Sequence, residues 1–179
     1  DITKTDGTLT VTPAAGATST VTGYSGVYDG AAHSIAVTNL ITGDVVSYSL
    51  NGTDWVSTLP EYTDVTAETT VYVKVENQNY NDRTGSGTVT ITPRSVTLTS
   101  ATDSKTYDGN PLTNHNVTVS GAGFVAGEGA AYEVTGSQTD VGFSANAFTY
   151  TLSAGTKAGN YDITKTDGTL TVTPAAGAT

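Results

Sequence analysis

The sequence of 179 residues contains 17 acidic and 7 basic residues, no cysteine and no methionine, and its formal net charge is -10. This negative charge excludes a surface that binds a phosphate backbone, so no nucleic acid is expected as a partner. The lack of cysteine excludes disulfides and thiolate metal sites. No apolar run approaches the roughly 20 residues that cross a bilayer, so we expect no membrane contact by this segment.

The first element in chain order is a strand that occurs twice. Residues 1–18 read DITKTDGTLTVTPAAGAT, and residues 162–179 repeat the same eighteen letters. Exposed positions tolerate substitution, so identity at every position exceeds what folding requires. We therefore predict a tandem array in which residues 1–18 are the last strand and linker of a preceding module. Because the sequence lacks an initial methionine, we expect it to be an internal piece of a longer protein.

The elements that follow are all predicted to be β-strands. Val71, Val73 and Val75 alternate with polar or amphipathic residues, and the same period of two recurs in residues 88–92 and 148–153. No stretch shows the i, i+3, i+4, i+7 pattern of an amphipathic helix. The sequence therefore predicts an all-β fold with threonine-rich outer faces.

The clearest local signal is a hairpin in VSYSLNGTDWV, residues 46–56. Asn51-Gly52 is typical of a two-residue type I′ turn, in which both residues take a positive φ. That register pairs Tyr48 with Trp55 and places both on the inner face of the sheet together with Leu50.

The chain also contains an internal repeat. Tyr28-Asp29-Gly30 recurs as Tyr107-Asp108-Gly109. Three more landmarks recur in the same order: Thr63-Asp64-Val65 as Thr139-Asp140-Val141, Asn79-Tyr80 as Asn160-Tyr161, and GTVTITP (87–93) as GTLTVTP (168–174). We predict two related modules, 19–93 and 94–174, followed by a linker, 175–179. The joint at Thr92-Pro93-Arg94-Ser95 is short and stiffened by proline, so it should be nearly rigid, whereas the final linker has more slack.

These four landmarks resemble the MBG/YDG-type tandem repeats of large bacterial cell-surface proteins and adhesins, and the resemblance covers both modules. It implies an extracellular, array-forming β domain of the kind found in stalks at the bacterial cell surface, and it transfers no activity. The stretch from Asp140 to Phe143 resembles a corner of immunoglobulin-like domains. We therefore predict two tandem Ig-like β-sandwich modules. Mucin-binding relatives suggest a β-grasp alternative, for which no amphipathic helix is found.

No catalytic constellation emerges from the sequence. His33 and His115 each follow a Tyr-Asp-Gly signal, but no serine, acid or second histidine stands at a recognisable spacing from either. We expect a polar residue entering a strand in each case, and no enzyme activity. Asp29 and Asp108 would suit Ca²⁺ in an acidic array, but calcium needs six to eight oxygens. The simpler interpretation is a turn whose glycine takes a positive φ, with no cofactor.

Two further hypotheses concern ligands and cross-links. Trp55 and Tyr48 would form an aromatic platform for a sugar if they were exposed, whereas the hairpin register makes Trp55 a core anchor. Some adhesin stalks contain a Lys–Asn isopeptide bond. The second module offers for it a lysine, an asparagine and two possible catalytic acids: Lys105, Asn160, Glu133 and Asp140.

The sequence thus favours a structural stalk or spacer repeat of a large bacterial surface adhesin, which extends a distal binding domain from the cell. The alternative is a weak carbohydrate- or mucin-binding repeat that gains avidity from the array. The expected partners are neighbouring repeats of the same chain, with a host glycan or mucin under the alternative. Residues 1–13 would also allow head-to-tail strand exchange between molecules. The expected location is extracellular.

Overall fold

The computed structural model describes residues 3–16 and 18–177, so the outermost residues of the predicted segments 1–18 and 175–179, and Ala17, lie outside the described residues. By their contacts, the residues divide into two units: Asp1–Gly26 with Ala32–Ile91, and Val27–Ala31 with Thr92–Thr179. The segment with the first Tyr-Asp-Gly motif therefore belongs to the second unit.

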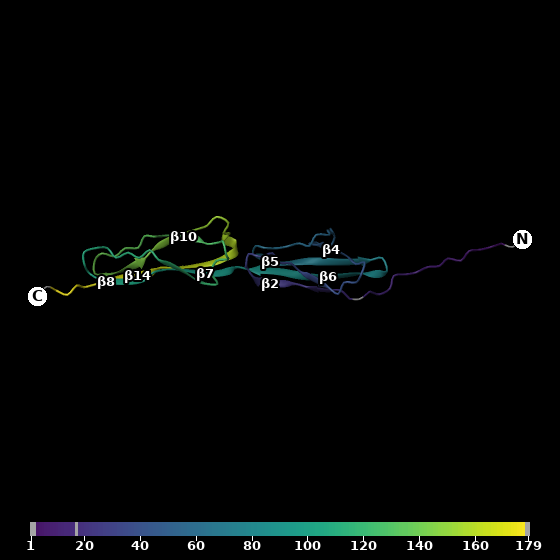
Figure 1. Ribbon diagram of the computed structural model, residues 1–179, viewed down its shortest axis with the longest axis horizontal. Coiled ribbons are helices and arrows are strands. Elements are labelled where there is room, and N and C mark those ends of the chain that lie inside the picture. The colour runs from purple at the N-terminus through teal and green to yellow at the C-terminus, as the bar shows by residue number, and fades with distance from the viewer. Residues whose placement is uncertain (1–2, 17, 178–179) are drawn as a thin grey trace. The chain divides into compact units, whose positions relative to one another are not determined.

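The prediction of an all-β, sandwich-like fold is confirmed. The described residues form fourteen strands and a single turn of 3-10 helix, with no α-helix among them (Figure 1). The helix that a β-grasp fold requires is thus absent from residues 3–16 and 18–177. None of the described helices is long or apolar enough to cross a membrane.

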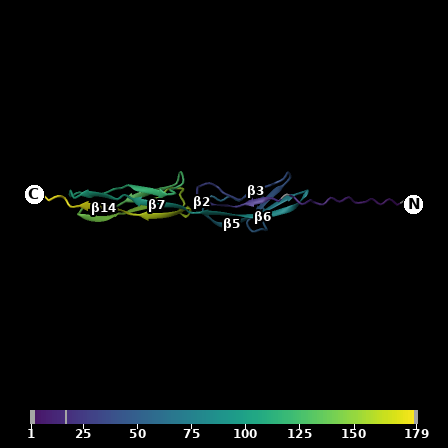
Figure 2. The same ribbon diagram turned by 90° about the horizontal axis from the view of Figure 1, so that it is seen from below.

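The first unit consists of a four-stranded sheet and a small second sheet. Its strands are β1 (Thr20–Thr22), β2 (Tyr24–Val27), β3 (Ala36–Thr38), β4 (Val45–Ser49), β5 (Thr66–Asn77) and β6 (Tyr80–Thr92). The larger sheet has the order β2-β6-β5-β4, and β1 pairs with β3. Figure 2 labels β2, β3, β5 and β6 of this unit. A Cβ on Gly85 of β6 would lie 2.8 Å from the Val21 side chain of β1, so glycine lets the two sheets approach closely here.

The core of the first unit follows the predicted alternation. Val71, Val73 and Val75 of β5 are buried, as are Val89 and Ile91 of β6. Burying a valine or isoleucine side chain contributes roughly 1.5–3 kcal/mol, so this stripe supplies much of the stabilisation of the sheet.

The predicted hairpin turn is wrong. Tyr48 pairs with Val56 rather than with Trp55, so a longer loop joins these two residues. Among the described residues of this loop only Gly52 has a positive φ, 77°, and a type I′ turn needs a second one. The Asn51 side chain instead accepts hydrogen bonds from the N–H groups two and three residues further on, which closes a wider loop. Leu50 is consequently exposed.

The second unit contains three small sheets. Its elements are β7 (Arg94–Ser100), β8 (Asp103–Thr106), β9 (Val117–Gly121), β10 (Ala130–Val134), β11 (Gly142–Asn146), β12 (Phe148–Leu152), the 3-10 turn η1 (Ala158–Asn160), β13 (Tyr161–Thr166) and β14 (Gly168–Thr173). The sheets have the orders β13-β7-β9, β11-β14-β8 and β10-β12.

Two of these sheets share one long parallel pairing. β13 pairs with β7 from Tyr161 opposite Arg94, and β14 pairs with β8 up to Thr173 opposite Thr106, with the same offset throughout. A Cβ on Gly168, where the chain passes from one sheet to the other, would lie 2.4 Å from the backbone carbonyl oxygens of Ser100 and Ala101. Glycine is therefore required for this crossing.

The corner predicted around Asp140 does not bury its aromatic residue. Phe143 lies on β11 opposite Thr171 and is 78% exposed, because the alternation of β11 turns its side chain outward. The resemblance to an immunoglobulin corner therefore holds for the amino-acid sequence and does not extend to the packing of Phe143.

The duplicated strand has two different environments. In the second unit Leu170 and Val172 are buried at 0% and 1% exposure. In the first unit the identical residues Leu9 and Val11 are 99% and 96% exposed, and residues 3–13 run extended beside no strand (Figure 1). Pairing begins only at Ala14, which bridges to Tyr80.

Candidate functional site: a buried tyrosine–glutamate cluster

A polar cluster in the second unit, here called the tyrosine cluster, consists of Tyr28, Glu128 and Tyr161. The Tyr28 hydroxyl donates to Glu128 Oε1 at 2.5 Å, and the Tyr161 hydroxyl donates to Oε2 at 2.6 Å. The two rings meet edge to face with centroids 5.5 Å apart, and both residues are buried. A carboxylate that accepts two hydroxyl groups forms charge-assisted hydrogen bonds, which are stronger than neutral ones.

Arg94 fixes the backbone around this cluster. Its Nε and Nη2 atoms donate to the carbonyl oxygens of Gly123 and Ala122, each at 2.7 Å, and Nη1 donates to the Tyr28 carbonyl at 3.5 Å. The Tyr28 N–H in turn donates to the Thr92 carbonyl at 2.9 Å. The planar guanidinium thus ties two loops together and fixes the position of Tyr28.

The cluster also sets the ionisation of Tyr161. Burial, followed by the hydrogen bond to Glu128, raises the pKa of Tyr161 to about 12 from its ordinary 10.0. The Val125 N–H donates to the same hydroxyl and acts in the opposite direction, but it is outweighed. The arrangement holds the two tyrosine side chains in fixed orientations against the Glu128 carboxylate.

We predict a loss of stability of the second unit in alkaline solution. The unfolded chain ionises Tyr161 near pH 10, whereas the folded unit keeps the proton until about pH 12, so raising the pH through this window favours unfolding. The loss should be about 2 kcal/mol at pH 12. Urea unfolding at pH 9 and pH 11.5, followed by circular dichroism, measures it. Tyr161→Phe should remove this part of the loss, and an equal loss in both proteins would contradict the assignment.

The first unit has a different arrangement at the equivalent acid. Asp44, like Glu128, follows a glycine of positive φ and donates its N–H to the carbonyl three residues before it. Burial would raise the pKa of Asp44, but hydrogen bonds from the Ile41 N–H, Asn77 and Arg83 outweigh it and hold the pKa below its usual range. Asp44 is therefore already occupied by an ion pair with Arg83.

The Tyr-Asp-Gly motifs form turns, as predicted. Gly30 and Gly109 both have a φ of 80°, and each aspartate accepts a hydrogen bond from the N–H two residues later. The Lys105 ammonium donates to Asp108 at 2.6 Å and lowers the pKa of that carboxyl. Within the described ranges no group of three or more His, Asp or Glu side chains is arranged to hold a metal ion.

The two aromatic candidates of the hairpin lie on opposite faces of the sheet. Tyr48 pairs with the buried Val73 and faces inward. Trp55 is half-buried on the outer face, with the Lys74 ammonium 5.4 Å from its ring centroid. With Tyr72 it lines an open groove of about 440 Å³. The expectation that Trp55 belongs to the inner face is therefore wrong, because the pairing of Tyr48 with Val56 reverses its orientation.

The cross-link candidates are not brought together. Lys105 lies opposite Val172, and Asn160 directly precedes Tyr161 at the other end of the same parallel pairing. Eleven strand positions, from 161 to 172, correspond to a separation on the order of 30 Å. Glu133 and Asp140 are both exposed.

The histidines have different surroundings. The His33 ring stacks on Tyr24 with centroids 3.9 Å apart, and its Nε2 lies 3.1 Å from the Tyr24 hydroxyl. His115 is exposed.

In comparisons with models of known protein families and with curated proteins, the sequence matches none of them.

Proposed function

We propose that this chain is a structural spacer repeat of a large bacterial surface adhesin, located outside the cell. One observation carries the proposal. Leu9 and Val11 are almost fully exposed, whereas their identical counterparts Leu170 and Val172 are buried. An extended apolar strand of this kind fits the sheet of a preceding module, which would bury it as β14 is buried.

The organisation of the two units supports the same proposal. Only Pro93 separates the end of β6 from the start of β7, and the Tyr28 turn of the first module packs in the second unit. The landmarks that resemble MBG/YDG repeats include this turn. Acidic, threonine-rich surfaces would keep a long array soluble and self-repelling. Separate chains in solution would be able to exchange residues 1–13 head to tail.

The spacer function predicts how size grows with copy number. For chains with one, two and three copies of residues 1–161, each chain ending in residues 162–179 so that the last module keeps β13 and β14, small-angle scattering should give a maximum dimension that rises in proportion to copy number at constant cross-section. Chains in which Ala14, Ala15 and Gly16 at each junction are replaced by Gly-Ser-Gly form the matched control and should scatter as shorter, more flexible particles. A maximum dimension that stays nearly constant as copies are added would contradict the proposal.

A second candidate function is weak, multivalent binding of a host glycan or mucin. The groove beside Trp55 favours it, because aromatic rings at an open groove offer a stacking surface. This candidate predicts that soluble mucin oligosaccharides at concentrations on the order of millimolar change Trp55 fluorescence. Tyr72→Ala should remove the change, and Tyr107→Ala, an exposed tyrosine of the second unit, should keep it. An unchanged spectrum would contradict glycan binding at this groove.

A further inference from the structure

The first and second units share a structural position at the point where the chain enters each unit. In the second unit Arg94 lies opposite Tyr161 in a parallel pairing. In the first unit Ala14 forms a parallel bridge with Tyr80, with Ala14 N–H donating to the Asn79 carbonyl and Asn81 N–H donating to the Ala14 carbonyl, both at 2.9 Å. Pro93 and Pro13 precede the two entering residues, so the two sites are equivalent.

This position is filled in the second unit. The Tyr28 side chain packs against Tyr161, and the Tyr28 N–H donates to the carbonyl of Thr92, two residues before Arg94. Only 4% of Tyr28 is exposed.

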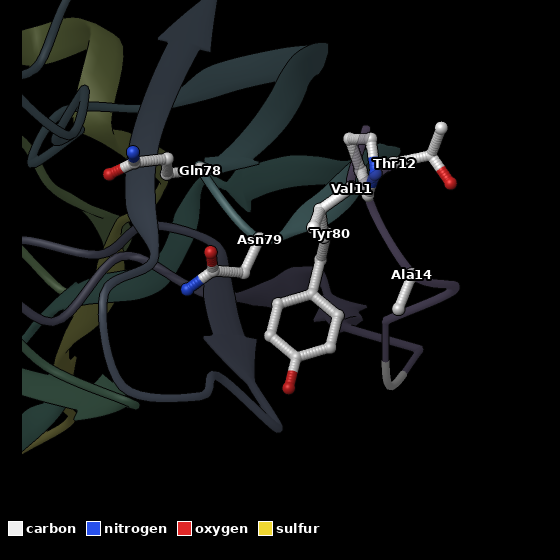
Figure 3. A pocket seen from close by; sticks show the side chains of 7 residues that line it. Val11, Thr12, Ala14, Gln78, Asn79 and Tyr80 are labelled. Carbon is white, nitrogen blue, oxygen red and sulfur yellow. The ribbon is translucent and has the colours of Figure 1, made fainter. Parts of the chain in front are cut away.

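In the first unit the equivalent position is hollow. A cavity of about 610 Å³ lies between residues 11–14 and residues 78–80. Figure 3 shows the Tyr80 ring and the Asn79 amide on one side of it and the chain from Val11 to Ala14 on the other.

The sequence duplication indicates what would fill this cavity. In the second unit the Tyr107 N–H donates to the Thr173 carbonyl at 2.8 Å, as the Tyr28 N–H does to Thr92. Thr173 and Thr12 are the same position of the duplicated strand. A preceding copy whose last strand is residues 1–13 would therefore place its own Tyr107 beside Thr12, at the edge of the cavity. In the second unit Tyr107 is 42% exposed, so its ring is available for such a contact.

We propose that the cavity between residues 11–14 and 78–80 is the docking site for the Tyr107 ring of the preceding copy, which joins successive repeats. This inference rests on the proposed tandem array. It names the contact that couples one copy to the next.

The chemistry of this contact differs from that of the tyrosine cluster. The counterpart of Glu128 is Asp44, which is paired with Arg83, and the counterpart of Arg94 is Ala14, whose side chain has no donor group. The Tyr107 ring would therefore be held by packing on Tyr80, with the Gln78 and Asn79 amides nearest to its hydroxyl. Removing the ring should weaken the contact, whereas removing the hydroxyl should change it little.

A chain of three modules tests this proposal. Residues 94–161 placed before Asp1 of the full chain add a preceding copy that residues 1–13 complete, and Trp55 remains the single tryptophan. Urea unfolding followed by Trp55 fluorescence then reports the first unit. Tyr107→Ala in the added copy should lower its midpoint by roughly 0.5 M urea, and Tyr107→Phe should leave it nearly unchanged. The matched control is Tyr107→Ala in the last module, which should not move the midpoint.

Two outcomes would overturn the proposal, and they differ in what else they reject. If the added copy is folded, as judged by dispersed amide resonances, but Tyr107→Ala in it leaves the Trp55 midpoint unchanged, the docking contact is wrong and the spacer function stands. If residues 94–161 stay unfolded beside residues 1–13, both the docking contact and the tandem array are rejected. The proposal would be supported if the NMR resonances of the Gln78 and Asn79 side-chain amides shift when Tyr107→Ala is made in the added copy, and do not shift when it is made in the last module.

Discussion

Leu170→Ala is expected to lower the free energy of unfolding of the second unit by about 2–5 kcal/mol, the usual cost of truncating a fully buried leucine. Leu170 is 0% exposed on β14, which is paired on both sides, by β11 and β8. Urea unfolding followed by circular dichroism measures the loss, and Trp55 fluorescence follows the first unit separately.

The duplicated strand supplies a matched control for this prediction. Leu9→Ala makes the same substitution as Leu170→Ala in the same local sequence, but Leu9 is 99% exposed. This variant should therefore leave the free energy of unfolding unchanged. If Leu9→Ala instead lowered the free energy of unfolding by an amount that depends on protein concentration, this would show strand exchange between chains. Light scattering of residues 1–179 and 19–179 would then give different masses, whereas equal masses at all concentrations would reject the exchange.

Glu128→Ala is expected to cost the second unit about 2–3 kcal/mol, because two buried tyrosine hydroxyls lose a charged acceptor. The change should also bring the pKa of Tyr161 down towards its ordinary value, since the hydrogen bond to Glu128 contributes to raising it. Urea unfolding measures the first effect, and ultraviolet titration against Tyr161→Phe measures the second.

Glu133→Ala is the control for Glu128→Ala. It removes a side chain of the same type from the same unit, but Glu133 lies on β10 and is exposed. The free energy of unfolding should therefore change by no more than about 0.5 kcal/mol. Equal losses in the two variants would mean that net charge, and not the tyrosine cluster, determines the effect.

The features that the sequence predicted correctly depend on local spacing. The alternation of Val71, Val73 and Val75 follows from the period of a strand, and Gly30 and Gly109 take the positive φ that a turn after aspartate requires. Both patterns are completed within a few residues. They therefore depend little on partners from a distant part of the chain.

The features that the sequence could not predict depend on distant partners or on competing side chains. Asn51 is a turn residue by type, but its side chain caps a wider loop, and this reversed the face of Trp55. Tyr28 and Glu128 stand one hundred positions apart, so no spacing rule connects them. The duplication of the Tyr-Asp-Gly motif indicated that this segment has a structural role. It did not indicate which of the two units the segment packs in.

The parallel pairing along β7–β8 and β13–β14 has a mechanical consequence. The chain enters the second unit at Arg94, where β7 begins, and leaves it at Thr173, where β14 ends. Tension between these two points shears the parallel strands along their length. Many backbone hydrogen bonds between the strands then bear the load together instead of breaking one after another. In a fibre held at both ends, the second unit would resist stretching along the direction in which the chain runs through it.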